Sequence, residues 1–157
     1  MTSTSEVLHP AGTAAIRRPP AASWLLVLGV TILAALSAAY VALTPAGGQT
    51  ELAGRTWEDF AAGEAEVASI FSRQLAMVGL IGAAFALLAA IVALFPYRRG
   101  ERWAWYALWL VPITFGGVAA RMLVDEYSVG FYYVVLAAVA AIGLALGARS
   151  SKATPDG

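Results

Sequence analysis

The sequence predicts an all-α integral membrane protein, a four-helix bundle with a partly helical loop on the extracytoplasmic side. Two observations lead to this prediction, and the cysteine count adds an exclusion. The 157 residues are 60% hydrophobic and 13% charged, whereas soluble domains carry about 25% charged residues. The charges leave four long uncharged gaps, and each gap contains an apolar run near the roughly 20 residues that a helix needs to cross a bilayer. The chain has no cysteine, which excludes disulfides and thiolate metal sites.

The four membrane spans are expected to be helical, because lipid offers no hydrogen-bonding partner to an open backbone. A membrane β-barrel would show alternating strands, and runs such as AAFALLAAIVALF do not alternate. A soluble helical bundle is the alternative, but four uncharged runs in so short a chain leave too little polar surface to dissolve it. We expect the spans at about residues 22–43, 74–95, 103–124 and 130–148.

The basic residues predict the orientation in the membrane. With four spans, both termini lie on one side, and that side carries seven of the ten basic residues and three of the ten acids. Since basic residues in short loops stay in the cytoplasm, both termini are predicted to be cytoplasmic. The polar tail 1–20 is expected to be disordered, and residues 149–157 form a second short tail. The alanine-rich, lysine-poor composition suits a high-GC bacterium, and so the bacterial inner membrane.

The stretch PYRRGERWAWYALW, residues 96–109, is expected to form the cytoplasmic turn between the second and third spans. Its arginines can meet anionic lipid headgroups, and its aromatic rings, each with one polar group, suit the membrane interface. Three arginines are too few for a nucleic-acid surface, so no nucleic-acid partner is expected. Trp109 lies deeper and is expected to pack against another helix. The predicted interface anchors are Arg98, Arg99, Arg102, Trp103, Trp105 and Tyr106.

The longest loop, residues 44–73, is expected on the outer side. Its second half, TWEDFAAGEAEVASIFSRQ, predicts an amphipathic helix that Thr56 caps, that Gly63 can bend and that runs into the second span. Its acidic polar face fits an anionic bilayer surface poorly. We therefore expect this helix to cap the bundle.

An outer cluster is the candidate ligand-binding site. Arg121 is the one basic residue well inside an apolar segment, where charges are costly and often functional. The structural alternative is an anchor that snorkels to the interface and pairs with Asp125 on the same helix face. The functional alternative is an acidic pocket for a cationic or amphipathic ligand, closed by Trp57 and Phe60. The candidate residues are Arg121, Asp125, Glu126, Glu64, Glu66 and Trp57.

Proline and small residues indicate how the spans are shaped. Pro112 removes one helix hydrogen bond from the third span and predicts a kink. The two glycines that follow can shape a cavity or permit close helix packing. Small-residue pairs at helical spacing can serve contacts within the bundle or between subunits. These pairs are Gly79 with Ala83 and Gly143 with Gly147.

No motif for chemistry is present in the sequence. It has no Walker loop, no HExxH and no nucleophile elbow, and its only histidine, His9, lies in the first tail. We therefore expect no catalytic residue, metal or cofactor. The stretch YRRGERWAWYALWLVP, residues 97–112, resembles a recurring signature of small four-helix membrane proteins of actinobacteria and other bacteria. This resemblance implies the topology and no particular activity.

The favoured function is that of a non-enzymatic accessory or interaction protein of the inner membrane. Its expected partners are the lipid bilayer and another membrane protein or a second copy of itself. Two alternatives are kept. One is a binder or enzyme for a lipid-like ligand in the outer pocket, and the other is a small oligomeric transporter.

Overall fold

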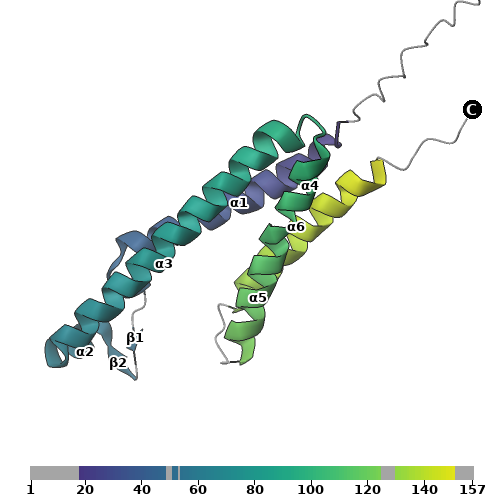
Figure 1. Cartoon of the computed structure of the whole chain (residues 1–157). Coiled ribbons are helices and arrows are strands. Elements are labelled where there is room, and N and C mark those ends of the chain that lie inside the picture. The colour runs from purple at the N-terminus through teal and green to yellow at the C-terminus, as the bar shows by residue number, and fades with distance from the viewer. Residues whose placement is uncertain (1–17, 49–50, 53, 125–129, 151–157) are drawn as a thin grey trace, which may run out of the picture.

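The computed structural model describes residues 18–48, 51–52, 54–124 and 130–150. Helices α1 (Ala21–Leu43) and α3 (Ala65–Val92) form the first two spans, and α3 continues into the π-helical turn η2 (Ala93–Tyr97). The third span is divided into α4 (Arg102–Leu108) and α5 (Leu110–Val124), and α6 (Gly130–Ser150) is the fourth (Figure 1). The predicted all-α membrane bundle is confirmed.

Four helical segments are long and apolar enough to cross a membrane: Ala21–Leu43, Ala65–Tyr97, Arg102–Val124 and Gly130–Ala148. Many of their large apolar side chains point outward, and Leu36, Ile81 and Ile113 are each more than 60% exposed. Helices that are apolar on their outer faces as well as in the core are typical of membrane spans. The chain is therefore a multi-pass membrane protein.

The helix of the second span extends beyond its apolar run, as expected for a loop helix that continues into the span. It begins at Ala65 rather than near residue 74, because the helix continues through a segment that contains Glu66 and Arg73 and is therefore outside the apolar run. The helical segment of 33 residues is about 50 Å long at 1.5 Å per residue. A bilayer core is about 30 Å thick. The first turns of α3 therefore extend beyond the lipid core.

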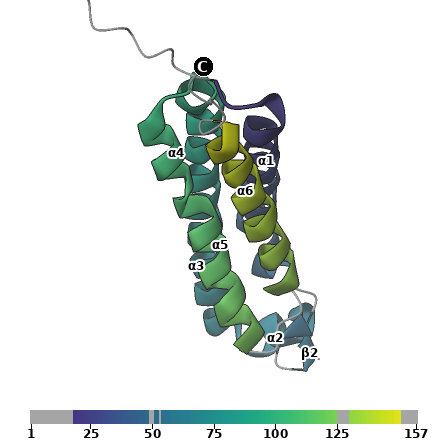
Figure 2. The same ribbon diagram turned by 90° about the vertical axis from the view of Figure 1, so that its right-hand side faces the viewer.

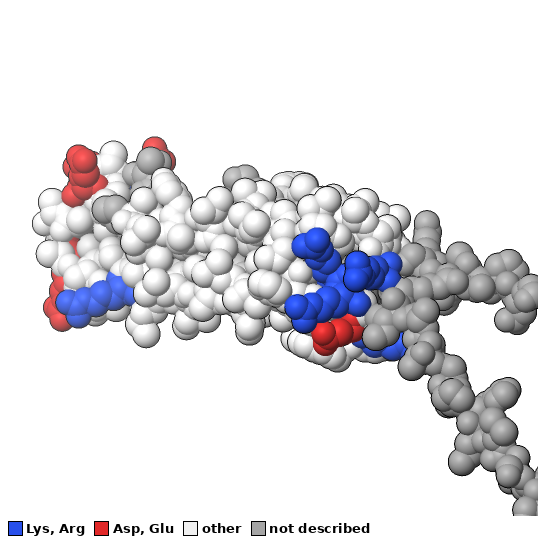
Figure 3. Space-filling view, turned by 90° about the horizontal axis from the view of Figure 1, so that it is seen from above, with Lys and Arg blue, Asp and Glu red and all other residues white. Residues whose placement is uncertain are grey.

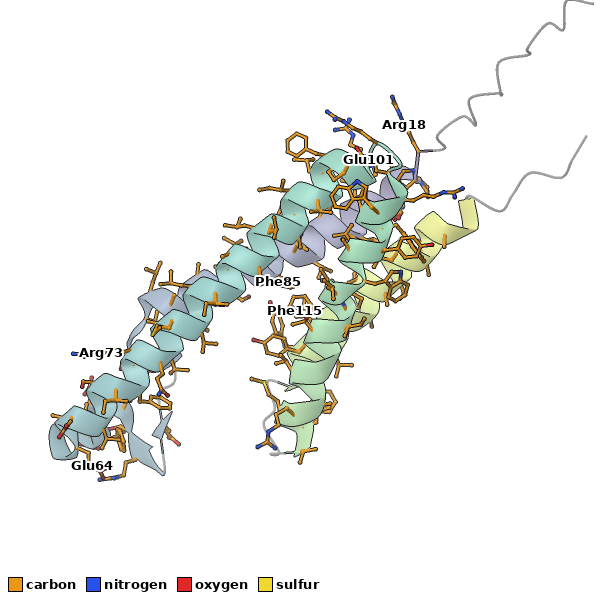
Figure 4. The ribbon with its side chains drawn as sticks, viewed as in Figure 1. Arg18, Glu64, Arg73, Phe85, Glu101 and Phe115 are labelled. Atoms are coloured by element: carbon orange, nitrogen blue, oxygen red, sulfur yellow. The ribbon has the colours of Figure 1, made fainter. Side chains whose placement is uncertain are left out.

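The four spans form a bundle that is open on one side. Helix α1 packs along α3 and along α6, and α6 packs along α5. On the remaining side, between α3 and α5, it is the short helix α4 that contacts α3 and η2. The α1–α3 pair and the α5–α6 pair meet at the end that carries α4 and diverge toward the opposite end (Figure 1). Figure 2 shows α5 and α6 in front of α3 and α1. Phe85 of α3 and Phe115 of α5 lie on the facing sides of this divergence (Figure 4).

Small residues allow the helices to approach α1 closely. A Cβ atom added to Gly79 would lie 2.7 Å from both the carbonyl oxygen of Ala38 and the backbone nitrogen of Ala42. A Cβ atom at Gly143 would lie 3.1 Å from the side chain of Val27. The sequence left open whether these glycines serve contacts within the bundle or between subunits. They serve contacts within it.

The third span is interrupted at Trp109, between α4 and α5. Pro112 has no N–H group, so the carbonyl oxygen of Leu108 receives no hydrogen bond from the residue four positions later. The Trp109 N–H group donates to the Tyr106 carbonyl oxygen at 3.2 Å, which is the tighter three-residue spacing. The irregularity expected from Pro112 thus lies just before the proline.

A small cap precedes α3 at the end opposite α4. After the turn η1 (Pro45–Gly48), strands β1 (Glu51–Leu52) and β2 (Arg55–Thr56) pair antiparallel. They turn at Gly54, whose φ of 73° suits a residue without a Cβ atom. Helix α2 (Trp57–Gly63) follows, and the backbone N–H of Asp59 donates to Thr56 Oγ1 at 3.2 Å. Thr56 therefore caps the N-terminus of α2, as predicted. The strands are too short to leave a sequence pattern.

Candidate functional site

The predicted outer ligand-binding residues lie on two diverging helix pairs. Trp57 begins α2, Glu64 lies between α2 and α3, and Glu66 is in the first turn of α3. Arg121 lies near the end of α5 that is far from α4 (Figures 1 and 4). Asp125 and Glu126 lie outside the described residues. Within the described part of the chain, the structure therefore does not bring the acids of the cap to Arg121.

Contacts inside the cap occupy two of these residues. Glu64 Oε1 accepts a hydrogen bond from Arg55 Nη2 at 2.8 Å, in an ion pair whose side chains are about half exposed. The Trp57 ring lies 5.8 Å from the Phe60 ring and 6.2 Å from the Phe71 ring, measured between centroids. Trp57 thus packs within the cap, where it helps to hold α2 against α3.

The predicted interface anchors lie at the α4 end. Basic side chains gather at this end of the molecule and most acidic side chains at the other (Figure 3). Arg98, Arg99 and Arg102 are exposed, and so are Trp103 and Tyr106. These positions are those that residues at a membrane interface would take.

Trp105 has a different environment from the other predicted anchors. It is partly buried against the core, and its Nε1–H donates to the Leu144 carbonyl oxygen of α6 at 3.0 Å. Trp105 therefore fastens α4 to α6. Trp109 packs against the same core, as predicted, and its ring centroid lies 5.8 Å from that of Trp105. The buried Trp109 Nε1 has no hydrogen-bond partner among the described residues.

A buried polar contact joins three helical segments near the same end. Ser23 of α1 is fully buried, and its Oγ atom donates to the Gly143 carbonyl oxygen of α6 at 2.6 Å. The same Oγ atom lies 2.5 Å from the Tyr97 hydroxyl oxygen of η2. Gly147 of α6 is next to the Tyr97 hydroxyl and leaves no room for a Cβ atom there. A serine and a tyrosine near span ends carry no pattern, so the sequence did not indicate this cluster.

Helices α5 and α6 together form an apolar groove of about 500 Å³. In the part of the chain that the structure describes, nothing lies within 4 Å of the position that a Cβ atom would take at Gly116. The positions at Gly79 and Gly143 are filled by internal packing, whereas this position is open. The groove is lined by Pro112, Gly116, Ala119, Ala120, Leu123, Val134, Ala137, Ala138 and Ala141.

The chemistry of the groove is that of a packing surface. All of its lining residues are apolar, and most are alanine or glycine, so it suits an apolar chain or helix and offers no polar side chain to a polar ligand. Among the described residues, no group of three or more His, Cys, Asp or Glu side chains could hold a metal ion.

Comparisons of the chain with known protein families, with curated proteins and with solved structures find no match.

Proposed function

We propose that this membrane protein is a non-enzymatic interaction protein of the bacterial inner membrane, and that it binds a transmembrane helix of another membrane protein in the α5–α6 groove. The observation that carries the proposal is the open position at Gly116 on the groove. In lipid, helices associate mainly through close packing at small residues. An open glycine in a groove lined mainly by alanines is a surface of this kind.

The contrast between the glycines supports an external occupant. Gly79 and Gly143 contact α1 closely, so their small size is explained inside the chain. Gly29, Gly116 and Gly117 have no such neighbour among the described residues, but of these three only Gly116 lines the groove, where alanine would favour the helix by about 1 kcal/mol. A helix from a partner would contact the groove from Pro112 to Leu123, which is about three turns of α5.

The binding surface can be tested with neighbouring glycines. Gly116 lies on the groove and Gly117 does not, and a Cβ atom added at either would meet no described atom within 4 Å. Gly116→Leu should fill the groove and abolish partner capture, whereas Gly117→Leu should leave capture unchanged. Both variants should insert into the membrane and unfold at similar temperatures.

Photocrosslinking in intact cells identifies the occupant. A photoreactive residue at Ala120, on the groove, should yield a discrete adduct with another polypeptide, and one at the exposed Ile113, which does not line the groove, should not. The adduct should disappear in Gly116→Leu and persist in Gly117→Leu. Adducts with lipid alone would contradict the proposal and favour a lipid-like ligand. An adduct with a second copy of the chain would contradict binding of another protein and would show that the groove serves self-association.

We further propose that both termini are cytoplasmic, which places the α4 end inside and the cap outside. The distribution of charge supports this orientation, since seven of the ten basic residues lie on the side of the termini. A C-terminal fusion to a phosphatase that is active only outside the cytoplasm should be inactive. The same reporter inserted in the loop between α1 and α3 should be active, and the reverse pattern would overturn the orientation.

A further inference from the structure

Four arginines at the α4 end have no carboxylate partner among the described residues. Arg18 precedes α1, Arg98 and Arg99 follow η2, and Arg102 opens α4. Over the ranges that the structure describes, none of the four makes an ion pair, whereas Arg55 at the opposite end pairs with Glu64. The basic side chains of this end surround an acidic one in Figure 3. The described end of the bundle therefore carries uncompensated positive charge.

The one carboxylate in the turn between η2 and α4, that of Glu101, already accepts a hydrogen bond from another side chain. Glu101 Oε2 accepts the indole N–H of Trp103 at 2.5 Å. This hydrogen bond directs the carboxylate toward a tryptophan rather than toward a guanidinium. Among the described residues, this turn therefore offers no carboxylate to the arginines.

One of the four arginines is held in place by an aromatic ring. The Arg98 guanidinium carbon lies 5.1 Å from the centroid of the Trp24 ring of α1. Stacking of a guanidinium on an aromatic face is attractive and leaves its edge donors available to an oxyanion. A side chain that is already ordered loses less conformational entropy when it binds a ligand. The Arg98 guanidinium is thus preorganised to donate hydrogen bonds to an anion.

The surface beside the arginines is apolar and exposed. Phe95, Trp103 and Tyr106 are 51%, 55% and 67% exposed, and all three lie within the spans or at their ends. Cationic groups at the end of a span lie at the depth of the lipid headgroups, with the acyl chains beside the helices below them. The two surfaces together match one molecule with a phosphate at one end and hydrocarbon at the other.

We propose that the α4 end holds an anionic phospholipid, whose phosphate binds Arg98 together with Arg99 and Arg102, and whose acyl chains lie along Trp103 and Tyr106. Guanidinium groups bind phosphate oxygens through pairs of charge-assisted hydrogen bonds. Trp24 acts as the positioning residue, because it orients Arg98 without contacting the phosphate. This site is separate from the α5–α6 groove and does not depend on the function proposed above.

The test measures lipid retention by the full chain in detergent. Native mass spectrometry would follow binding of phosphatidylglycerol, with zwitterionic phosphatidylcholine of the same acyl chains as the reference. We expect phosphatidylglycerol to bind more tightly than phosphatidylcholine. Inorganic phosphate should compete only weakly, since it lacks the acyl chains. Equal binding of the two lipids would overturn the proposal, and full displacement by inorganic phosphate would reduce the site to a phosphate site.

Substitutions separate a built site from general attraction to a negative surface. Arg98→Gln should weaken phosphatidylglycerol binding by about fivefold or more, which is the effect expected for one arginine near an anionic surface. The matched control is Arg73→Gln, which removes the same charge from an exposed arginine of α3, far from the α4 end, and should leave binding unchanged. Equal losses in the two variants would show that only net charge matters.

Two further variants test the geometry without changing the charge. Arg98→Lys keeps the charge and loses the planar fork of donors, and Trp24→Leu releases Arg98. Both should weaken phosphatidylglycerol binding, with the unfolding midpoint measured without that lipid as the check on folding. Wild-type affinity in Arg98→Lys would overturn the proposed geometry even if Trp24→Leu proved unstable.

Discussion

The Ser23 Oγ atom lies 2.5 Å from the Tyr97 hydroxyl oxygen, across 74 residues of chain and between the first and second spans. Ser23 has one hydroxyl proton, and it donates that proton to the Gly143 carbonyl oxygen. Tyr97 is therefore the donor to Ser23. The two hydrogen bonds therefore run from η2 to α1 and from α1 to α6, and they join the α1–α3 helix pair to the α5–α6 pair.

Removing either hydroxyl should destabilise the bundle. Tyr97→Phe and Ser23→Ala should each lower the free energy of unfolding by about 1–3 kcal/mol, because a buried partner loses its hydrogen bond. A double-mutant cycle measured by unfolding in mixed micelles should give a coupling of about 0.6–1.7 kcal/mol, the range found between membrane helices. Tyr40→Phe, at an exposed position on α1, is the control and should have no effect. A coupling of zero would mean that the two hydroxyls do not act together.

The glycines of the spans should respond unequally to alanine. Gly79→Ala places a Cβ atom against backbone atoms of Ala38 and Ala42, which cannot move aside as a side chain can. We expect a loss of about 1–3 kcal/mol in the free energy of unfolding from overpacking. Gly29→Ala meets no described atom within 4 Å and should be neutral or stabilising by up to about 1 kcal/mol. Thermal unfolding of the two variants side by side would check this, and equal effects would contradict the close contact of α3 with α1.

The interruption at Trp109 should disappear when the proline is removed. Pro112→Ala supplies the N–H group that the Leu108 carbonyl oxygen lacks, so α4 and α5 should join into one straighter helix. The chain has no cysteine, so spin labels can be placed at Tyr106 and Val124, which are 67% and 75% exposed. The distance between the labels should lengthen in Pro112→Ala. A label pair at Met77 and Leu88 on α3 should keep its distance, and an unchanged distance for both pairs would mean that the proline does not cause the break.

Removing the N-terminal capping residue of α2 should loosen the segment of β1, β2 and α2 and leave the helix bundle folded. Thr56→Ala deletes the acceptor of the Asp59 N–H bond, which contributes about 1 kcal/mol at a helix N-terminus. Hydrogen exchange of the amides in α2 should become faster, while the unfolding midpoint of the bundle stays the same. Glu64→Gln removes a half-exposed ion pair with Arg55, and such pairs contribute about 0–1 kcal/mol. A larger effect of Glu64→Gln than of Thr56→Ala would contradict this order.

The sequence predicted the spans well because lipid imposes a simple rule on composition. Apolar length determines where α1, α5 and α6 run, and the proline and the Thr56 cap are local signals that act where they stand. The helix that runs into the second span was predicted as well, with a possible bend at Gly63, and α2 ends at Gly63 before α3 begins at Ala65. The side of the bundle left open was not predictable, because every face of these helices is apolar and hydropathy does not record which faces meet.

The candidate site was harder to predict than the fold. The sequence places the acids of the cap and Arg121 on the same side of the membrane. They are separated in the structure because the two helix pairs diverge (Figure 1). The Ser23 cluster and the stacking of Arg98 on Trp24 join residues more than 70 positions apart. Contacts of this range depend on how helices rotate about their axes, which apolar spacing leaves undetermined.

The divergence of the two helix pairs also gives the protein an uneven cross-section. The two helix pairs lie close together at the α4 end and spread apart toward the opposite end (Figure 1). Such a wedge displaces more lipid from one leaflet than from the other. We expect the protein to gather where the leaflet that holds its wide end is on the convex side of the bilayer, so that its position in a cell would depend on membrane shape as well as on partners.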